Sequence, residues 1–177
     1  MATYSQEQQE LSRESLQLAL FDLMQHQAFA SITVSALAAR AGISRMGFYR
    51  NYDTKEQVLS DYFDRRVAPF YDALSASVAQ GPASISQAYF AYIDRHSTLF
   101  EVLIQSGAEN VLIDRFTYYV DRFYRDHVKT VPFTGDYAFF WTSFVAAGLY
   151  KMTIDWLKTG KRASVATLAA IATKLAG

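Results

Sequence analysis

The segment from Arg45 to Lys55 combines side chains that can read DNA bases with side chains that can hold phosphates. Arg45 can donate two hydrogen bonds to O6 and N7 of guanine, and Met46 offers an apolar contact to a thymine methyl group. Tyr49, Asn51 and Lys55 can bind phosphate oxygens, which fix the register of a protein on a duplex. This combination predicts that the protein binds double-stranded DNA.

Other chemistry finds little support in the residue pattern. The three histidines, His26, His96 and His127, lie far apart, with no i, i+4 pair and no thiolate or carboxylate at ligand spacing. The chain also lacks a nucleophile elbow, a phosphate-cradling glycine loop and a paired-carboxylate motif. We therefore expect no metal site, no cofactor and no enzymatic activity.

The elements that must position the DNA-facing residues are two short helices joined by a glycine turn. Thr33 can cap the first helix, and Ser44 can cap the second. Gly42 supplies the left-handed backbone position that ends a helix, Ile43 anchors the turn, and Phe48 is the expected core residue of the second helix. The first helix has apolar residues at i, i+3, i+4 and i+7, namely Val34, Leu37, Ala38 and Ala41. The pattern predicts a helix-turn-helix.

Burial of Phe48 leaves one group of side chains on the outer side of the second helix, where they can reach a groove or its phosphates. These residues are Arg45, Met46, Gly47, Tyr49, Arg50 and Asn51. A residue as small as Gly47 allows close approach to DNA. A third helix begins after Thr54, where Thr54 and Gln57 form a possible capping box and leave amide donors that favour a nearby anion.

The segment from about Ser31 to Leu59 resembles the N-terminal domain of the TetR family of bacterial transcriptional regulators. The matching signature is Ile32-Thr-Val-x-x-Leu-Ala-x-x-Ala-Gly-Ile-Ser44, then Phe48-Tyr49, Lys55-Glu56 and Leu59. The chain departs from the family at Asn51-Tyr52, where the family often has histidine or tyrosine followed by phenylalanine.

The resemblance implies phosphate contacts from Thr33, Tyr49 and Lys55. It implies base contacts from Ser35, Arg45, Met46 and Gly47. The complete set of expected DNA contacts is Thr33, Ser35, Ser44, Arg45, Met46, Gly47, Tyr49, Arg50, Asn51 and Lys55.

The segment that carries the expected DNA contacts has no excess of positive charge, because its cations are matched by acids. From Met1 to Tyr52 the cations are Arg13, Arg40, Arg45 and Arg50, and the acids are Glu7, Glu10, Glu14 and Asp22. Phosphate neutralisation drives most non-specific affinity, so we expect weak non-specific binding and a modest dependence on salt. The alternative is a three-helix subdomain that packs against a larger body and touches no nucleic acid.

Glycine, proline and polar clusters punctuate helical patterns throughout the 177 residues, and no alternating strand pattern is visible. We expect an all-α fold of about nine helices, with a DNA-binding domain at 1–53 and an effector-binding and dimerisation domain at 54–177. The expected helices begin near Ser5, Thr33 and Ser44 and then span Thr54–Val78 with a possible kink at Pro69, 83–95, 97–105, 109–129, 136–159 and 164–175, with a turn at 131–135.

The last two helices carry more apolar surface than one helix face requires, which favours a homodimer. A two-fold pair of such helices forms a four-helix bundle, and this arrangement is the usual TetR-family dimer. The expected interface residues are Phe140, Phe144, Met152, Trp156, Ala166, Ala169 and Ala170. The alternative is that these side chains form the core of a monomer.

Aromatic residues also suggest a ligand cavity, which the resemblance implies between the fourth and eighth helices. The expected lining is Tyr62, Phe90, Phe100, Phe116, Tyr119, Trp141 and Phe144. Such a cavity would take an apolar or aromatic small-molecule effector. The alternative is that the aromatic stripe is only core.

The resulting hypothesis is a dimeric DNA-binding transcriptional regulator, most often a repressor in this family, that a small-molecule effector releases from a palindromic operator. The alternative is a TetR-fold coactivator or protein-binding module that does not itself read DNA. The chain contains no cysteine, and it shows neither a signal-peptide pattern nor an apolar run long enough to span a bilayer. We therefore expect a cytoplasmic protein without a membrane partner.

Overall fold

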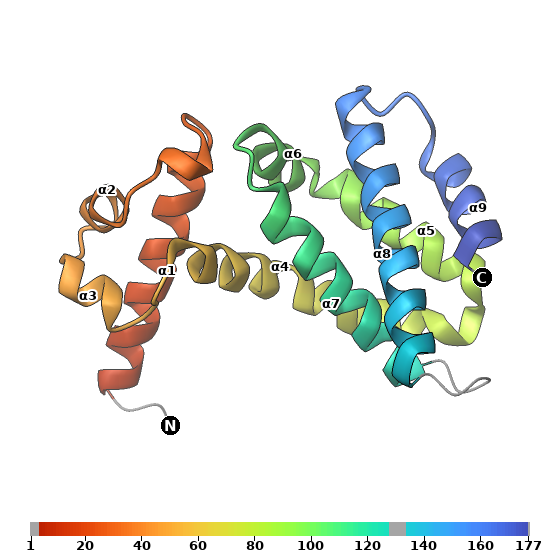
Figure 1. Ribbon diagram of the computed structural model, residues 1–177, viewed down its shortest axis with the longest axis horizontal. Coiled ribbons are helices and arrows are strands. Elements are labelled where there is room, and N and C mark those ends of the chain that lie inside the picture. Colours follow the sequence, from red (N-terminus) through yellow and green to blue (C-terminus); the bar gives the residue numbers. More distant parts are fainter. Residues whose placement is uncertain (1–3, 128–133, 177) are drawn as a thin grey trace. The chain divides into compact units, whose positions relative to one another are not determined.

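The computed structural model describes residues 4–127 and 134–176, and within these ranges all regular structure is helical (Figure 1). The helices are α1 (Tyr4–Met24), α2 (Val34–Arg40), α3 (Arg45–Tyr49), α4 (Lys55–Ser77), α5 (Pro82–Arg95), α6 (Ser97–Gln105), α7 (Glu109–His127), α8 (Gly135–Lys158) and α9 (Val165–Ala176). Two 3₁₀ turns, η1 (Phe29–Ser31) and η2 (Val78–Gln80), complete the order. The predicted all-α class with about nine helices is confirmed.

Most helix boundaries fall within two residues of those predicted. Pro69 lies inside α4 without ending it. The predicted turn at 131–135 and the last two residues of the helix expected over 109–129 lie mostly outside the described residues.

The chain divides into two compact units. One contains the residues up to Arg66 together with Val102–Val111, and the other contains Val67–Glu101 and the residues from Leu112 onward. These units are defined by contacts within the chain. The division predicted after residue 53 instead separates a DNA-binding domain from an effector-binding and dimerisation domain. That division therefore remains a prediction.

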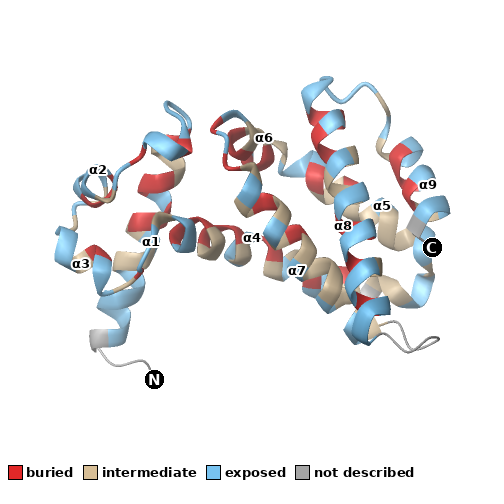
Figure 2. Ribbon diagram, viewed as in Figure 1, coloured by how far each residue is buried: buried red, intermediate tan, exposed pale blue. Residues whose placement is uncertain are grey.

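The first unit has a small, closed apolar core. Leu16 and Leu20 of α1, Leu37 of α2 and Phe48 of α3 are each 0% exposed, and Val58 of α4 joins them at 0%. Buried positions recur along α1 and α4 at helical spacing (Figure 2). Full burial of one such side chain stabilises the fold by about 1.5–3 kcal/mol, so these few residues fix the position of α2 and α3.

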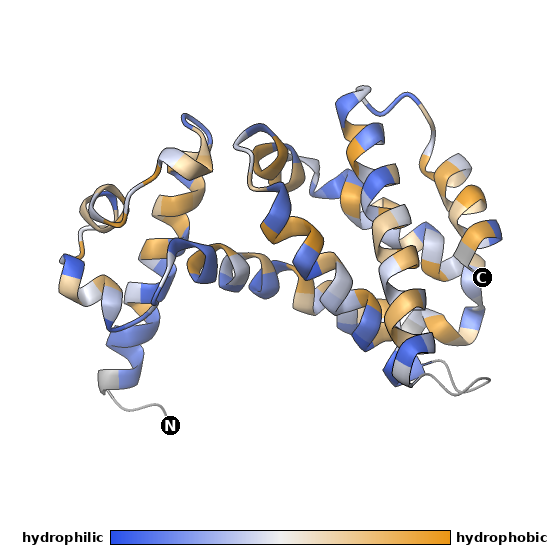
Figure 3. Ribbon diagram, in the orientation of Figure 1, coloured by the Kyte–Doolittle hydropathy of each residue, from blue (hydrophilic) through white to orange (hydrophobic). Residues whose placement is uncertain are grey.

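The core of the second unit is aromatic. Phe90 stands edge-on to Trp156 with ring centroids 6.2 Å apart, and Phe116 stands edge-on to Phe100 at 6.5 Å. Apolar and neutral colours predominate along α9, which packs against α5 (Figure 3). The hydroxyl of Tyr89 pairs with Thr153 at 2.7 Å, and desolvation by the surrounding core raises the pKa of Tyr89 far above its usual range.

A polar network ties α1 to α4 within the first unit. The Asp61 carboxylate accepts hydrogen bonds from Arg13 at 3.0 Å, Gln17 at 2.7 Å and the Tyr52 hydroxyl at 2.5 Å. Burial alone favours the neutral carboxyl, but the bonds from Tyr52 and Arg13 outweigh burial, so the pKa of Asp61 lies below its usual range.

We expect Asp61→Asn to lower the free energy of unfolding at pH 7 by about 1–3 kcal/mol, because the charge-assisted bonds are lost. A depressed pKa stabilises the fold above the unfolded-state value of about 4. That contribution is lost as the pH falls from the unfolded-state pKa through the lower folded-state pKa, so the difference in stability between wild type and variant should shrink progressively below about pH 4. Urea titrations across this range measure the difference.

Glu14→Gln, which changes an exposed acid of the same helix α1, is the matched control. A constant difference in stability between wild type and Asp61→Asn from pH 7 to pH 3 would contradict the account of Asp61.

Candidate nucleic-acid interface

Both helices of the helix-turn-helix begin with the predicted caps. The Thr33 hydroxyl oxygen accepts from the Ala36 amide at 3.1 Å, and the Ser44 hydroxyl oxygen accepts from the Gly47 amide at 3.0 Å. Each cap satisfies an amide that has no partner within the helix and typically contributes about 1 kcal/mol. The starts of α2 and α3 are therefore fixed locally.

The turn between them has the predicted left-handed glycine. Gly42 has φ +69°, and the Ile43 amide donates to the Ala38 carbonyl at 2.9 Å while the Gly42 amide donates to Ala39 at 3.1 Å. This pair of bonds closes α2 in a Schellman motif. Phe48 is fully buried, so the opposite side of α3 is left outward.

The outward side of α3 carries the predicted readers. Met46 is 68% exposed and Tyr49 is 45% exposed, and Arg45 and Arg50 are also exposed. The Arg45 guanidinium lies 5.8 Å from the centre of the Tyr49 ring, which favours one arrangement of the two side chains. Three further predicted contacts, all of them hydroxyl residues, are exposed as well: Thr33, Ser35 and Ser44.

Gly47 has a role in packing that the sequence interpretation missed. It is half-buried, and a Cβ atom at this position would lie 2.6 Å from Cγ2 of Ile43 and 3.3 Å from Oγ of Ser44. The first distance is too short for two carbon atoms. A side chain at position 47 would therefore require Ile43 or the helix to shift, so the absence of one has a packing role.

The side chain of Asn51 is hydrogen-bonded to α3, the helix that it follows. Its amide nitrogen donates to the Gly47 carbonyl at 2.8 Å, and its buried Oδ1 has no hydrogen-bond partner among the described residues. The bond satisfies a carbonyl at the C-terminal end of α3. A phosphate contact from Asn51 stays a prediction.

Lys55 has three partners within the protein. Its ammonium donates to the main-chain carbonyls of Phe29 at 2.7 Å, Ala30 at 3.1 Å and Ile32 at 2.8 Å, and it lies 4.7 Å from the centre of the Phe29 ring. Lysine has three donors, so these carbonyls use its full capacity. A phosphate contact from Lys55 stays a prediction.

One signal could have revealed the partners of Lys55. It is the first residue of α4, where the helix dipole disfavours a positive charge. A lysine at that position indicates nearby acceptors.

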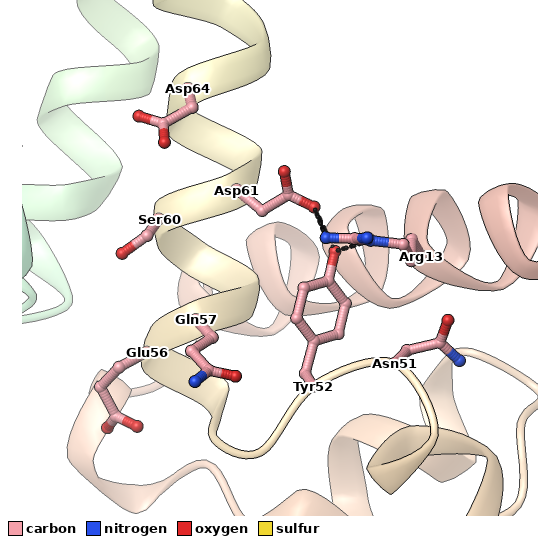
Figure 4. A pocket seen from close by; sticks show the side chains of 8 residues that line it. All are labelled: Arg13, Asn51, Tyr52, Glu56, Gln57, Ser60, Asp61 and Asp64. Atoms are coloured by element: carbon pink, nitrogen blue, oxygen red, sulfur yellow. Dashed lines mark hydrogen bonds and ion pairs between the residues drawn. The ribbon is translucent and has the colours of Figure 1, made fainter.

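An open groove of about 420 Å³ lies beside the loop between α3 and α4 (Figure 4). Its lining residues are Arg13, Asn51, Tyr52, Glu56, Gln57, Ser60, Asp61 and Asp64. Three of these eight are acids, which repel a phosphate backbone. DNA contacts are therefore expected from the exposed residues of α2 and α3 and not from this groove.

Some of the cations in this unit are already paired. Arg40 bonds Asp22 at 2.7 Å, and Arg65 pairs with Glu10. Among the described residues, no group of histidines and acids has a geometry suited to a metal ion. Within the same ranges, every helix is too short or too polar to cross a membrane.

The residues predicted to line a ligand pocket lie in different surroundings. Tyr62 belongs to the first unit, where it stacks on Phe21 at 5.0 Å, and the other six belong to the second unit. Phe90, Phe100 and Phe116 are buried core residues. Tyr119 and Trp141 are half-buried in aromatic contacts with Tyr71, Tyr124 and Tyr137, and Phe144 is 66% exposed. The pocket stays a prediction.

The predicted dimer residues divide into exposed and buried groups. Phe140 is 65% exposed and Phe144 is 66% exposed. Trp156 and Ala169 are 4% and 5% exposed, and the Trp156 indole donates to the Ala163 carbonyl at 2.8 Å within the same chain. Of the remaining predicted residues, Ala166 and Ala170 are exposed and Met152 is half-buried. Phe139, absent from the predicted set, is 65% exposed.

Two segments of the chain each match a family model. Residues 19–62 match the model described as bacterial regulatory proteins of the tetR family, and residues 81–177 match one described as the C-terminal region of transcriptional regulators. An uncharacterized HTH-type transcriptional regulator of Bacillus subtilis (strain 168), YxbF, is 32% identical over 78 residues, 44% of this chain. The aligned segment spans 20% of the length of that curated relative.

Solved structures show a similar fold over nearly the whole chain. The dihydroxyacetone kinase operon activator DhaS is 21% identical with a TM-score of 0.53, covering 93% of both chains. Thermus thermophilus FadR, a TetR-family repressor in complex with lauroyl-CoA, is 17% identical with a TM-score of 0.56, covering 93% of this chain and 92% of that one. The fatty acid degradation regulator FadR from Bacillus halodurans is 12% identical with a TM-score of 0.53, covering 93% and 94%.

The second family match alone covers more than half of the 177 residues, and the first covers most of the helix-turn-helix unit with its capped helices and glycine turn. The chain therefore belongs to the TetR family of bacterial transcriptional regulators.

Proposed function

We propose that this TetR-family regulator binds a palindromic operator as a homodimer, represses transcription there, and is released by an apolar or aromatic small molecule. The observation that carries the proposal is the outward side of α3, where Arg45, Met46 and Tyr49 stand exposed at the start of a capped helix that follows a glycine turn. A recognition helix places its N-terminal residues against base edges in the major groove.

Each exposed residue has a distinct part in this proposal. Arg45 reads guanine with two parallel hydrogen bonds, and Met46 contacts a thymine methyl group. Tyr49 and Arg50 hold phosphates and set the register. Hydroxyls of the predicted contacts Thr33, Ser35 and Ser44 supply further polar contacts; those of Thr33 and Ser44 each accept one cap bond, which leaves the O–H free to donate to a phosphate oxygen.

The homodimer is supported by the apolar surface of α8. Phe139, Phe140 and Phe144 each expose about two thirds of their area, which is expensive in water and typical of a protein contact. Gly148 follows one turn later, with nothing within 4 Å of the place a Cβ would occupy, so a partner helix could approach closely there. A two-fold axis through this surface would present two recognition helices to the two halves of a palindrome.

Regulation by an effector follows from the aromatic composition of the second unit. The lauroyl-CoA complex of the Thermus thermophilus repressor supports an apolar ligand class for a protein of this fold. An effector must favour one arrangement of the two reading heads by contacts that differ between the two states.

A second candidate function is an activator or a module that binds another protein. One observation favours it: Arg13, Arg40 and Arg65 are paired with acids, which leaves the reading unit with a weak electrostatic attraction for DNA. The DhaS structure, an operon activator by its title, has the same fold.

We expect Arg45→Ala to lose about 1–3 kcal/mol of discrimination at one base position in each half-site, because a bidentate contact to guanine disappears. The operator is first captured from random fragments of the source genome. Fluorescence anisotropy with the operator and its single-base variants, at two salt concentrations, then measures the change.

Arg40→Ala, which removes a cation paired with Asp22, is the matched control and should keep the base preference. Enrichment of no fragment, even at low salt, would overturn DNA reading in the absence of a corepressor and favour the protein-binding alternative. Equal loss of affinity for every sequence in Arg45→Ala would assign that residue to a phosphate.

We expect Phe144→Glu to convert the dimer to a monomer at micromolar concentration, because each protomer loses the burial of one ring, worth about 1.5–3 kcal/mol, and gains a charge in the interface. Sedimentation velocity measures the oligomeric state. Leu11→Glu is the matched control, since Leu11 is 55% exposed on α1 and lies outside the proposed interface. A wild-type protein that sediments as a monomer would refute the homodimer.

A further inference from the structure

The 3₁₀ turn η1 is bonded on two sides within the first unit. The Phe29 amide donates to the Ser106 carbonyl at 2.8 Å. On the other side, the Lys55 ammonium binds the carbonyls of Phe29, Ala30 and Ile32. The turn thus joins the end of α6 to the beginning of α4.

The Ser106 carbonyl is available because of the way α6 ends. Gly107 has φ +73°, its amide donates to Ile104 at 3.1 Å, and the Ala108 amide donates to Leu103 at 2.9 Å. Ser106 is only 3% exposed, so water has little access to its carbonyl. The Phe29 amide, which begins a 3₁₀ turn and has no partner within it, satisfies this acceptor. A buried carbonyl and amide separated from each other would both lose their partner.

Lys55 fixes the other side of the same turn. Its partners include the Ile32 carbonyl, and Ile32 directly precedes Thr33, the cap of α2. Ile32 is 2% exposed, so its side chain is held in the core as well. The position of η1 therefore sets where α2 begins, and the short glycine turn carries this position to α3.

The chain connects this turn to the other unit through α6 and α7. The segment Val102–Val111 belongs to the compact unit of the reading helices, whereas residues 97–101 of α6 and 112–127 of α7 belong to the second unit. Both helices are continuous across this division, so a shift of either helix along its axis reaches Ser106.

We propose that η1, held between the Ser106 carbonyl and the Lys55 ammonium, transmits displacements of the α6–α7 turn to α2 and to the recognition helix α3. Lys55 is a positioning residue in this device. The regulatory meaning of the coupling rests on the proposed function, but the coupling itself is a property of the free protein. An effector that displaces α6 or α7 would break or strain the bond between Phe29 and Ser106 and shift the start of α2.

The chain offers a matched pair of substitutions for the test. Gly107 and Gly160 end α6 and α8 with the same two bonds and with φ of +73° and +69°, and neither has an atom within 4 Å of an added Cβ. Alanine at either site therefore strains only the backbone. The strain should shift the equilibrium between the formed and the opened helix end by about tenfold toward the opened state. The two variants differ in which helix end they disturb.

The readouts are amide hydrogen exchange over residues 33–50 and operator affinity. We expect Gly107→Ala to speed exchange in α2 and α3 by about tenfold and to weaken operator binding, while Gly160→Ala changes neither. Gly107→Asn should restore wild-type exchange, because asparagine tolerates the left-handed conformation. Lys55→Met should speed the same amides, and its effect combined with Gly107→Ala should be less than the product of the two.

Equal effects of Gly107→Ala and Gly160→Ala on residues 33–50, or no effect of Gly107→Ala, would overturn the coupling. Faster exchange in α2 and α3 specific to Gly107→Ala supports the coupling even when wild-type protein captures no DNA fragment. In that case the proposed function fails and the coupling stands, so the two failures are distinguishable.

Discussion

The attachment of the chain segment before α2 depends on an ammonium group surrounded by main-chain oxygens. Lys55 holds the chain segment just before α2 against the first turn of α4, in competition with the dipole of the helix that it begins. Its three carbonyl partners belong to a segment that forms no regular hydrogen-bond ladder with another element. Without a cation at this position, the oxygens would need water in a partly buried site. The caps of α2 and α3 are therefore formed by neighbouring residues, whereas the segment before α2 is held in place by Lys55 of α4.

Several charged side chains of the first unit pair with one another and so hold its helices together. Asp61 gathers Arg13, Gln17 and Tyr52 and so joins α1 to α4, while Arg65 pairs with Glu10 and Arg40 with Asp22. The formal charge of the whole chain is also zero, because its 17 lysines and arginines equal its 17 acids in number. Affinity for DNA in such a protein has to come from specific contacts more than from a general attraction.

The sequence predicts this fold well wherever the determining interactions are local. Thr33, Gly42 and Ser44 have cap and turn roles that depend on residues within four positions, and the structure confirms each of them. The partners of Lys55 lie 23 to 26 positions away, so a lysine at the start of α4 indicates that acceptors are near but no short-range pattern identifies them. Trp156 shows a related limit, because apolar spacing does not distinguish the core of one chain from a contact between two chains. Its predicted place at an interface is not visible in one protomer.

The missing side chain at position 47 has a consequence for how the proposed base preference of α3 can change. A Cβ there would lie 2.6 Å from Cγ2 of Ile43, so a larger residue at the third position of α3 requires a shift of that side chain or of the helix. Under the proposed function, changes of base preference, in evolution or in the laboratory, meet the least steric resistance at the exposed base readers Arg45 and Met46. A library randomised at those two positions leaves the packing of α3 intact, whereas one that includes position 47 also has to repack the turn around Ile43.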